Sequence, residues 1–132
     1  MAREKEFIDY NDEGKIKRET LPEGNEYDFL LKRNEGHFGD IALTFMDRKI
    51  TYEELHEKIG EYSKKLYQMG IGKGDVVGIC LANNPEGIYI YYALVRLGAV
   101  IVGLSPLNNE YKMQRDLEIT KPKVVISLDM MY

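Results

Sequence analysis

The spacing of apolar residues along this chain predicts a long amphipathic helix over residues 52–69. Apolar side chains recur there every three or four positions, which is the period of a helix with one buried face; they are Tyr52, Leu55, Ile59, Tyr62, Leu66 and Met69. Thr51 and Glu54 fit a capping box at the helix start. Gly70 fits a left-handed cap at its end.

Shorter apolar stretches before this helix predict a pair of strands. Residues 41–46 form an apolar stretch, and a very short one follows at 49–51. Asp47 and Arg48 separate them, as expected for a tight turn between a strand and a short return strand. A further helical stripe of Tyr27, Leu30 and Leu31 precedes the pair and ends near Gly36.

In the second half of the chain, apolar runs alternate with helical patterns. The runs occupy residues 76–81, 99–104 and 124–128, and their continuity predicts strands buried on both faces. Asn84 and Asn109 are suitable caps for the two intervening helices, and Gly98 and Pro122 mark their ends. Strands that alternate with helices predict a parallel sheet with right-handed crossovers.

We therefore predict an α/β fold: a three-layer, doubly wound, mostly parallel sheet with flanking helices and a small strand–turn–strand at residues 41–51. Residues 1–25 are mostly polar and are expected to form an arm with at most one short helix. Phe7, Ile8 and Ile16 could attach this arm to a larger body. Residues 26–132 are expected to form one incomplete subdomain.

The sequence stops directly after the third apolar run, where a doubly wound sheet normally needs another covering helix. We expect the chain to be a fragment of a larger protein. The alternative is that residues 129–132 belong to a tail folded back over the sheet.

Composition excludes several classes of protein. The net charge of −4 gives no electrostatic reason to bind nucleic acid or an anionic membrane. A single cysteine, Cys80, excludes an internal disulfide and suits a cytoplasmic location. No signal peptide is evident, and no apolar run approaches the roughly 20 residues that a membrane helix requires.

Three loops are candidates for ligand binding. The glycines at 70, 72 and 74 suggest a phosphate loop, but they run from a helix into a strand, the reverse of the order in which such loops work; a cap and a tight turn are the better interpretation. Residues 81–86 and 105–109 each follow a strand, at the sheet edge where α/β proteins bind ligands. Both are interpreted first as structural connections.

No residue of this sequence is assigned a catalytic, cofactor-binding or metal-binding role. Cys80 lies in an apolar strand and is expected to be a core residue. His37 and His56 lack metal-ligand spacing, and the charged neighbours of His56 predict a solvent-exposed face. The tyrosines at 89, 91 and 92 lack the basic partners of an RNA site; Tyr91 and Tyr92 are expected to pack on the sheet, with Tyr89 pointing away.

Five segments, in order, resemble the adenylate-forming (AMP-binding) enzyme superfamily, in particular acyl-CoA synthetases of the long-chain fatty acid–CoA ligase type. They are ITYEEL at 50–55, MGIGKGDVVGI at 69–79, NNPE at 83–86, LVRLGAVIVGLSPLN at 94–108 and TKPKVVI at 120–126. The resemblance covers about residues 26–128. It departs from the family at residues 103–106, where many members place proline directly after the strand.

The resemblance implies a two-step ligase. ATP, with Mg²⁺, adenylates a carboxylic acid, and coenzyme A then takes the acyl group as a thioester. The phosphate loop, the acidic ribose motif and the catalytic lysine of the family lie downstream of the matched region, so this chain alone is expected to be inactive. The small-molecule acid and the rest of the parent polypeptide are the expected partners, with no nucleic acid and no membrane span.

Two other functions stay open at this stage. The same fold could belong to an amino acid-activating adenylation domain, of the non-ribosomal peptide or D-alanine ligase type. Alternatively, the chain could be a non-catalytic interaction module. An exposed sheet face would also favour self-association of the isolated chain.

Overall fold

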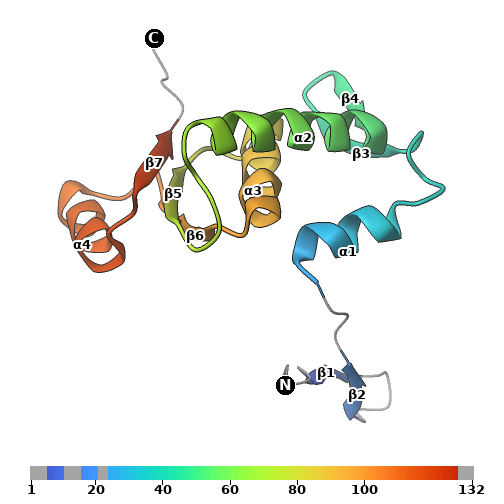
Figure 1. The fold of residues 1–132 in the computed structure, drawn as a ribbon, viewed down its shortest axis with the longest axis horizontal. Helices are drawn as coiled ribbons and strands as arrows, with labels where there is room; N and C mark the ends of the chain where they lie inside the picture. The colour runs from blue at the N-terminus through green and yellow to red at the C-terminus, as the bar shows by residue number, and fades with distance from the viewer. Residues whose placement is uncertain (1–5, 11–15, 21–23, 128–132) are drawn as a thin grey trace.

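The computed structural model describes the backbone of residues 6–10 and 16–20, and both backbone and side chains of residues 24–127. Within this part, the chain forms three small sheets and four helices (Figure 1). None of the described helices combines the length and the apolar character that crossing a lipid bilayer requires.

The amino-terminal segment contains two strands. β1 (Glu6–Tyr10) pairs antiparallel with β2 (Ile16–Thr20), with Tyr10 opposite Ile16. The expectation of an arm with at most one short helix did not include this strand pair. Aromatic and β-branched residues in both segments favour extended backbone, a preference that the polar composition of the arm concealed. The expected attachment through Phe7, Ile8 and Ile16 lies outside the described side chains.

Helix α1 (Glu26–Arg33) follows, and Asn25 caps its first turn by accepting a hydrogen bond from the Asp28 amide at 2.9 Å. β3 (Ile41–Phe45) and β4 (Arg48–Thr51) then pair antiparallel, which confirms the predicted strand–turn–strand. The turn places Met46 at a φ of 52°.

Helix α2 (Tyr52–Gln68) starts at the predicted capping box. The Thr51 hydroxyl accepts from the Glu54 amide, and the Glu54 carboxylate accepts from the Thr51 amide at 3.1 Å. The helix ends before Gly70, whose φ is 89°. Leu55, Ile59 and Leu66 are buried as predicted, but Met69 is 63% exposed because it lies in the cap beyond the last helical turn.

The main sheet is parallel, as predicted. Strands β5 (Val76–Cys80), β6 (Val100–Gly103) and β7 (Val124–Ser127) lie in the order β6-β5-β7. The two connections run through α3 (Pro85–Leu97) and α4 (Glu110–Thr120). Figure 1 shows α2 and α3 on one side of the sheet and α4 on the other, the layering expected of a doubly wound fold.

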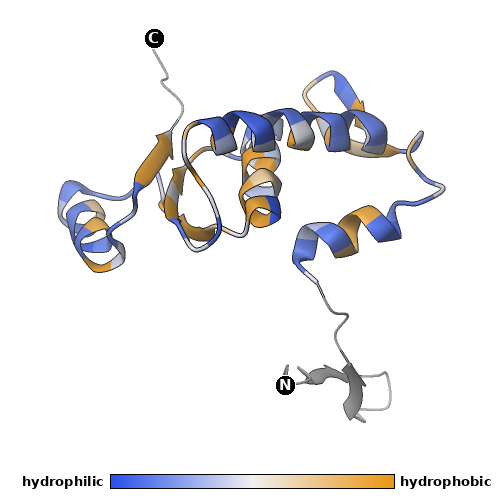
Figure 2. Cartoon of the chain, viewed as in Figure 1, coloured by the Kyte–Doolittle hydropathy of each residue, from blue (hydrophilic) through white to orange (hydrophobic). Residues whose placement is uncertain are grey.

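The outer strands are less buried than their apolar runs predicted. Val100 on β6 is 50% exposed and Val125 on β7 is 43% exposed. Both strands are edges of the described sheet, and α4 contributes no fully buried residue to cover them. Only β5 has the burial expected of a central strand, and Figure 2 shows its hydrophobic residues between those of its neighbours.

Two hydrophobic clusters stabilise the part of the fold formed by residues 24–127. The first, which we call the aliphatic cluster, packs α2 and α3 against the sheet and consists of Leu66, Ile71, Val77, Ile90, Ala93 and Leu94. The second, the aromatic cluster, joins α1, the β3–β4 pair, α2 and α3, and consists of Tyr27, Ile50, Leu55, Ile59 and Tyr89.

The predicted orientation of the tyrosines on α3 is wrong. Tyr89 is 4% exposed and packs against Tyr62 of α2, with ring centroids 5.9 Å apart. Tyr91 is 37% exposed. The prediction treated the sheet as the only surface that α3 could cover, whereas α3 also packs along α2, and this second contact buries the opposite face.

Candidate functional site

A groove of about 1290 Å³ lies at the carboxyl ends of β5 and β6. The loops that follow the two strands form one side of it, with residues 81–84 after β5 and residues 104–105 after β6. The backbone amide of Leu104 donates to the Ile79 carbonyl at 2.8 Å, which holds the second loop beside the first. The structure therefore brings the two predicted candidate loops to one edge of the sheet.

Elements distant in sequence form the other side of the groove. Leu30 comes from α1, residues 42–45 from β3, and Tyr52 from the start of α2. Sequence reasoning missed this wall because its residues carry only an apolar signal, which does not distinguish a groove lining from a core.

Apolar and aromatic side chains dominate the lining. Its polar side chains are hydroxyls and amides only: Thr44, Tyr52, Asn83, Asn84, Tyr91, Tyr92 and Ser105. No charged side chain of the described residues lines it. The described lining of the groove therefore suits apolar groups, and none of its side chains is a cation that could bind a phosphate.

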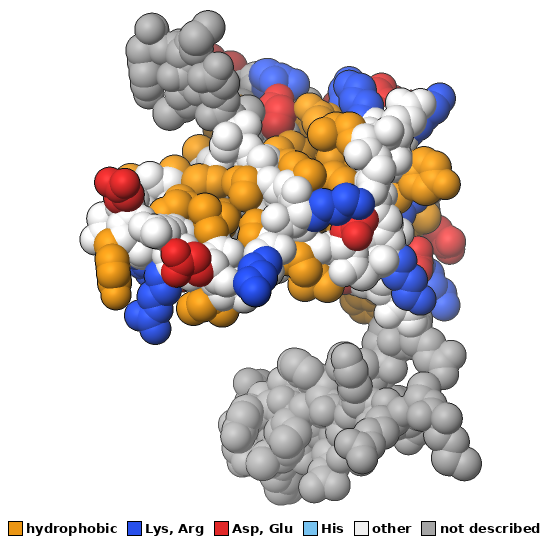
Figure 3. Space-filling model, turned by 60° about the vertical axis from the view of Figure 1, so that its left-hand side comes forward, with side chains coloured by type: hydrophobic (Ala, Val, Ile, Leu, Met, Phe, Trp, Pro, Cys, Tyr) orange, Lys and Arg blue, Asp and Glu red, His pale blue; other side chains and the backbone are white. Residues whose placement is uncertain are grey.

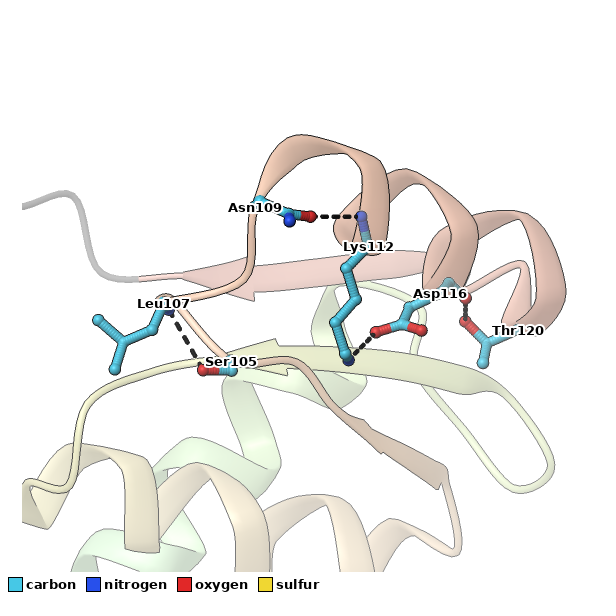
Figure 4. Close-up of polar contacts among 6 residues, drawn as sticks. All are labelled: Ser105, Leu107, Asn109, Lys112, Asp116 and Thr120. Atoms are coloured by element: carbon cyan, nitrogen blue, oxygen red, sulfur yellow. Dashed lines mark hydrogen bonds and ion pairs between the residues drawn. The ribbon is translucent and has the colours of Figure 1, made fainter.

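The polar groups of the two loops bind their own backbone. The Asn84 side chain accepts from the Gly87 amide at 2.8 Å and so caps α3. Ser105 accepts from the Leu107 amide at 3.2 Å, and Asn109 accepts from the Lys112 amide at 2.9 Å, as Figure 4 shows. These contacts agree with the interpretation of both loops as structural connections.

Tyr91 extends the groove toward α1. Its hydroxyl donates to the Glu26 carboxylate at 2.8 Å, a hydrogen bond between residues 65 positions apart. This bond, together with burial, raises the pKa of Tyr91, so the phenol keeps its proton and cannot serve as a base near neutral pH. The contact ties the first turn of α1 to the groove.

The glycine turn at 70–75 lies at the opposite end of the sheet. Its Asp75 carboxylate accepts from the Gly72 amide at 2.8 Å and from the Lys123 ammonium at 3.2 Å. Those two contacts lower the pKa of Asp75. Lys123 also donates to the Gly70 carbonyl at 2.8 Å. The turn is therefore a cap stabilised by Lys123, the residue before β7, and the Gly72 amide that a phosphate would need is already bonded to the Asp75 carboxylate.

The remaining candidates show no sign of metal chemistry. Within residues 24–127, no group of three or more His, Cys, Asp or Glu side chains could hold a metal ion. Cys80 is a half-buried free thiol at the end of β5. His37 pairs with Asp40 at 2.9 Å on the surface. His56 is half-buried and bonds to Tyr27 and Asn34, so the prediction of a solvent-exposed face at His56 is wrong.

Comparison with known proteins identifies the family. The family profile described as AMP-binding enzyme matches residues 30–130. The long-chain-fatty-acid–CoA ligase of Bacillus subtilis is 28% identical over 104 residues, which are 78% of this chain and 19% of that protein. Nonribosomal peptide synthetase 8 of Aspergillus fumigatus is 27% identical over an alignment of 132 positions that covers 96% of this chain and 2% of that protein.

A solved structure gives the same result. The Klebsiella oxytoca NpsA N-terminal subdomain, in complex with 3-hydroxyanthranilyl-AMSN, superposes with a TM-score of 0.76 at 29% identity over 80% of this chain and 27% of that subdomain. The chain thus spans about a fifth of the ligase and about a quarter of the subdomain, so it corresponds to an incomplete N-terminal subdomain. With a profile that matches most of its length, the chain belongs to the AMP-binding enzyme family.

Proposed function

We propose that residues 26–132 form part of the N-terminal subdomain of an ATP-dependent carboxylic acid–CoA ligase, with residues 1–25 as an arm ahead of it. Such an enzyme forms an acyl-adenylate with release of pyrophosphate and then passes the acyl group to coenzyme A. The observation that carries the proposal is the profile match over residues 30–130, which coincides with the β6-β5-β7 sheet and its helices.

In this proposal the chain supplies scaffold rather than chemistry. Among residues 24–127, no charged side chain lines the groove, so a charged acyl-adenylate needs its phosphate partners from elsewhere in the polypeptide. ATP, Mg²⁺ and coenzyme A are cofactors of the proposed complete enzyme. We expect no ATP–pyrophosphate exchange from the 132-residue chain alone; exchange that is lost on substitution of a groove residue would contradict the scaffold role.

A fatty acid is the proposed substrate class, because the mainly apolar lining of the groove suits an acyl chain and a long-chain-fatty-acid–CoA ligase is among the relatives. The second candidate is an amino acid or aryl acid loaded onto a carrier protein, which the synthetase and NpsA relatives favour. Pyrophosphate exchange by the full-length protein with fatty, aryl and amino acids separates these classes. Thioester formation on free coenzyme A as opposed to a carrier protein then distinguishes ligase from synthetase.

Self-association of the isolated chain stays a prediction. Val100 and Val125 are partly exposed on the sheet, and on the face drawn in Figure 3 hydrophobic side chains form patches between charged ones. Exposed apolar patches favour association. Sedimentation velocity at rising concentration tests this expectation, and a strictly monomeric profile would refute it. A cytoplasmic location is likewise proposed, from the family resemblance and the single cysteine.

A further inference from the structure

His56 bonds to both ends of one short helix. The Nδ1 atom of its ring lies 3.2 Å from the Tyr27 hydroxyl, in the first turn of α1. Its Nε2 atom lies 3.0 Å from the side-chain nitrogen of Asn34, the residue that caps the end of α1. One side chain on α2 thus contacts both termini of α1.

Helix α1 depends on these contacts. It has only eight residues, and a helix of that length is not stable in water without tertiary packing. Tyr27 is its only fully buried residue, packed within 6.4 Å of the Tyr92 ring and under the Arg96 guanidinium at 5.5 Å. Two other apolar residues of α1 are exposed, Phe29 at 47% and Leu31 at 36%.

The hydrogen-bond pattern fits a neutral ring. A neutral imidazole carries one donor and one acceptor nitrogen. Because the Asn34 amide nitrogen can only donate, Nε2 accepts, and Nδ1 carries the hydrogen that it donates to the Tyr27 oxygen. Protonation would add a hydrogen on Nε2 that faces the hydrogens of Asn34. Turning the Asn34 amide would restore this bond but would leave a positive charge in a half-buried site.

No described neighbour neutralises that charge. The elements that pack around His56 carry ionisable groups, and none of these forms an ion pair with it in the described structure: Tyr27 and Asp28 on α1, Arg96 on α3, Glu53 and Glu57 on α2, and Glu35, His37 and Asp40 beside Phe38. The ring of Phe38 packs edge-on at 5.8 Å and shields His56 further. Burial accordingly lowers the pKa of His56 from its ordinary value of 6.5.

We propose that His56 is a pH-sensitive clamp that holds α1 against α2 and α3 when neutral and releases α1 when protonated. Release would open the groove, because Leu30 of α1 lines it and Glu26 of α1 is bonded to Tyr91 in its wall. The lowered pKa of His56 means that the docked state of α1 binds the proton less well than the released state. Docking is therefore complete above pH 6.5 and weakens as the pH falls through the folded-state pKa.

Hydrogen exchange of the α1 amides, measured by NMR between pH 5 and pH 7.5 and corrected for intrinsic rates, tests the clamp. We expect α1 protection, relative to that of α2, to fall at least about threefold at pH 5, since each unit of pKa difference changes the opening equilibrium up to tenfold. His56→Gln should remove this pH dependence. The matched control is His37→Gln, because His37 is the only other histidine and lies on the surface; it should respond as the wild type does.

Asn34→Asp provides a second test that does not remove the ring. A carboxylate beside Nε2 supplies the missing counter-ion, so the pKa of His56, followed by its ring proton shifts, should rise above 6.5. The α1 helix should then be held at least as firmly at pH 5.5 as at pH 7.5. A pH-independent α1 in the wild type, an unchanged response in His56→Gln, or a response in Asn34→Asp equal to that of the wild type would each overturn the proposal.

Discussion

The aliphatic and aromatic clusters are stabilised by different interactions. The aliphatic cluster contains only hydrocarbon side chains, and Val77, Ala93 and Leu94 in it have no exposed surface. The aromatic cluster contains two tyrosine rings, and the hydroxyl of one of them, Tyr27, bonds to His56, 29 residues away in sequence. The stability of the aliphatic cluster should therefore depend on the volume of its side chains and be insensitive to pH. The stability of the aromatic cluster should fall when single polar atoms are removed.

Leu94→Ala should have the largest effect. Leu94 is completely buried on α3 between α2 and the sheet, so truncation removes apolar contacts and leaves a cavity. We expect the free energy of unfolding to fall by about 2–5 kcal/mol, measured by urea denaturation at pH 7. Leu107→Ala is the control, because Leu107 is 93% exposed and its truncation should change stability by less than about 0.5 kcal/mol. Equal effects would contradict the assignment of the aliphatic cluster as the main core.

Tyr27→Phe should have a smaller and more local effect in the aromatic cluster. The ring stays in place, but the hydroxyl that accepts from His56 is lost. We expect a loss of about 0.5–1.5 kcal/mol, detected as faster exchange of the α1 amides while the amides of β5 keep their protection. A uniform loss of protection across α1 and β5 would show that the two clusters unfold as one unit. Tyr67→Phe, at a 69% exposed position on α2, serves as the control.

Asp75→Asn should give the smallest effect and a defined pH dependence. The Gly72 amide and the Lys123 ammonium lower the pKa of Asp75, so its ionised form favours the folded state. That contribution is present above the ordinary carboxyl pKa and is lost as the pH falls through the lowered value.

In urea titrations, the wild type should therefore lose more stability between pH 7 and pH 3 than Asp75→Asn does. Asp47→Asn, in the exposed turn between β3 and β4, should keep the wild-type pH dependence. If Asp75→Asn shows the same pH dependence as the wild type, the contact with Lys123 contributes nothing to folding.

The sequence predicted those parts of the fold that local signals determine. The capping box at Thr51, the glycine cap at Gly70 and the asparagine caps at 84 and 109 all lie within a few residues of their partners, and each was confirmed. The parallel sheet followed from continuous apolar runs, which have few other interpretations. The aliphatic cluster was therefore largely accessible from the sequence.

The aromatic cluster was not predictable in this way. Tyr89 was expected to point away from the sheet, and its burial was missed because helical periodicity does not show that α2 covers that face of α3. His56 was assigned to solvent because its sequence neighbours are charged, whereas its partners are 22 and 29 residues away. Only one side of the groove was predicted, for the same reason. The strand ends imply the two loops, but no signal in the nearby sequence shows that α1 and β3 lie opposite them.

The strand order has a consequence for how the chain is synthesised. β5 is the first strand of the parallel sheet to be made and the central one in space, with β6 on one side and β7 on the other. While a ribosome extends the chain from Val76 to Ser127, the backbone amides and carbonyls along at least one edge of β5 stay unpaired until β7 emerges. Unpaired strand edges of this kind are the sites at which nascent chains aggregate. Expression of this family member should therefore be most sensitive to chaperone supply during the interval between translation of β6 and that of β7.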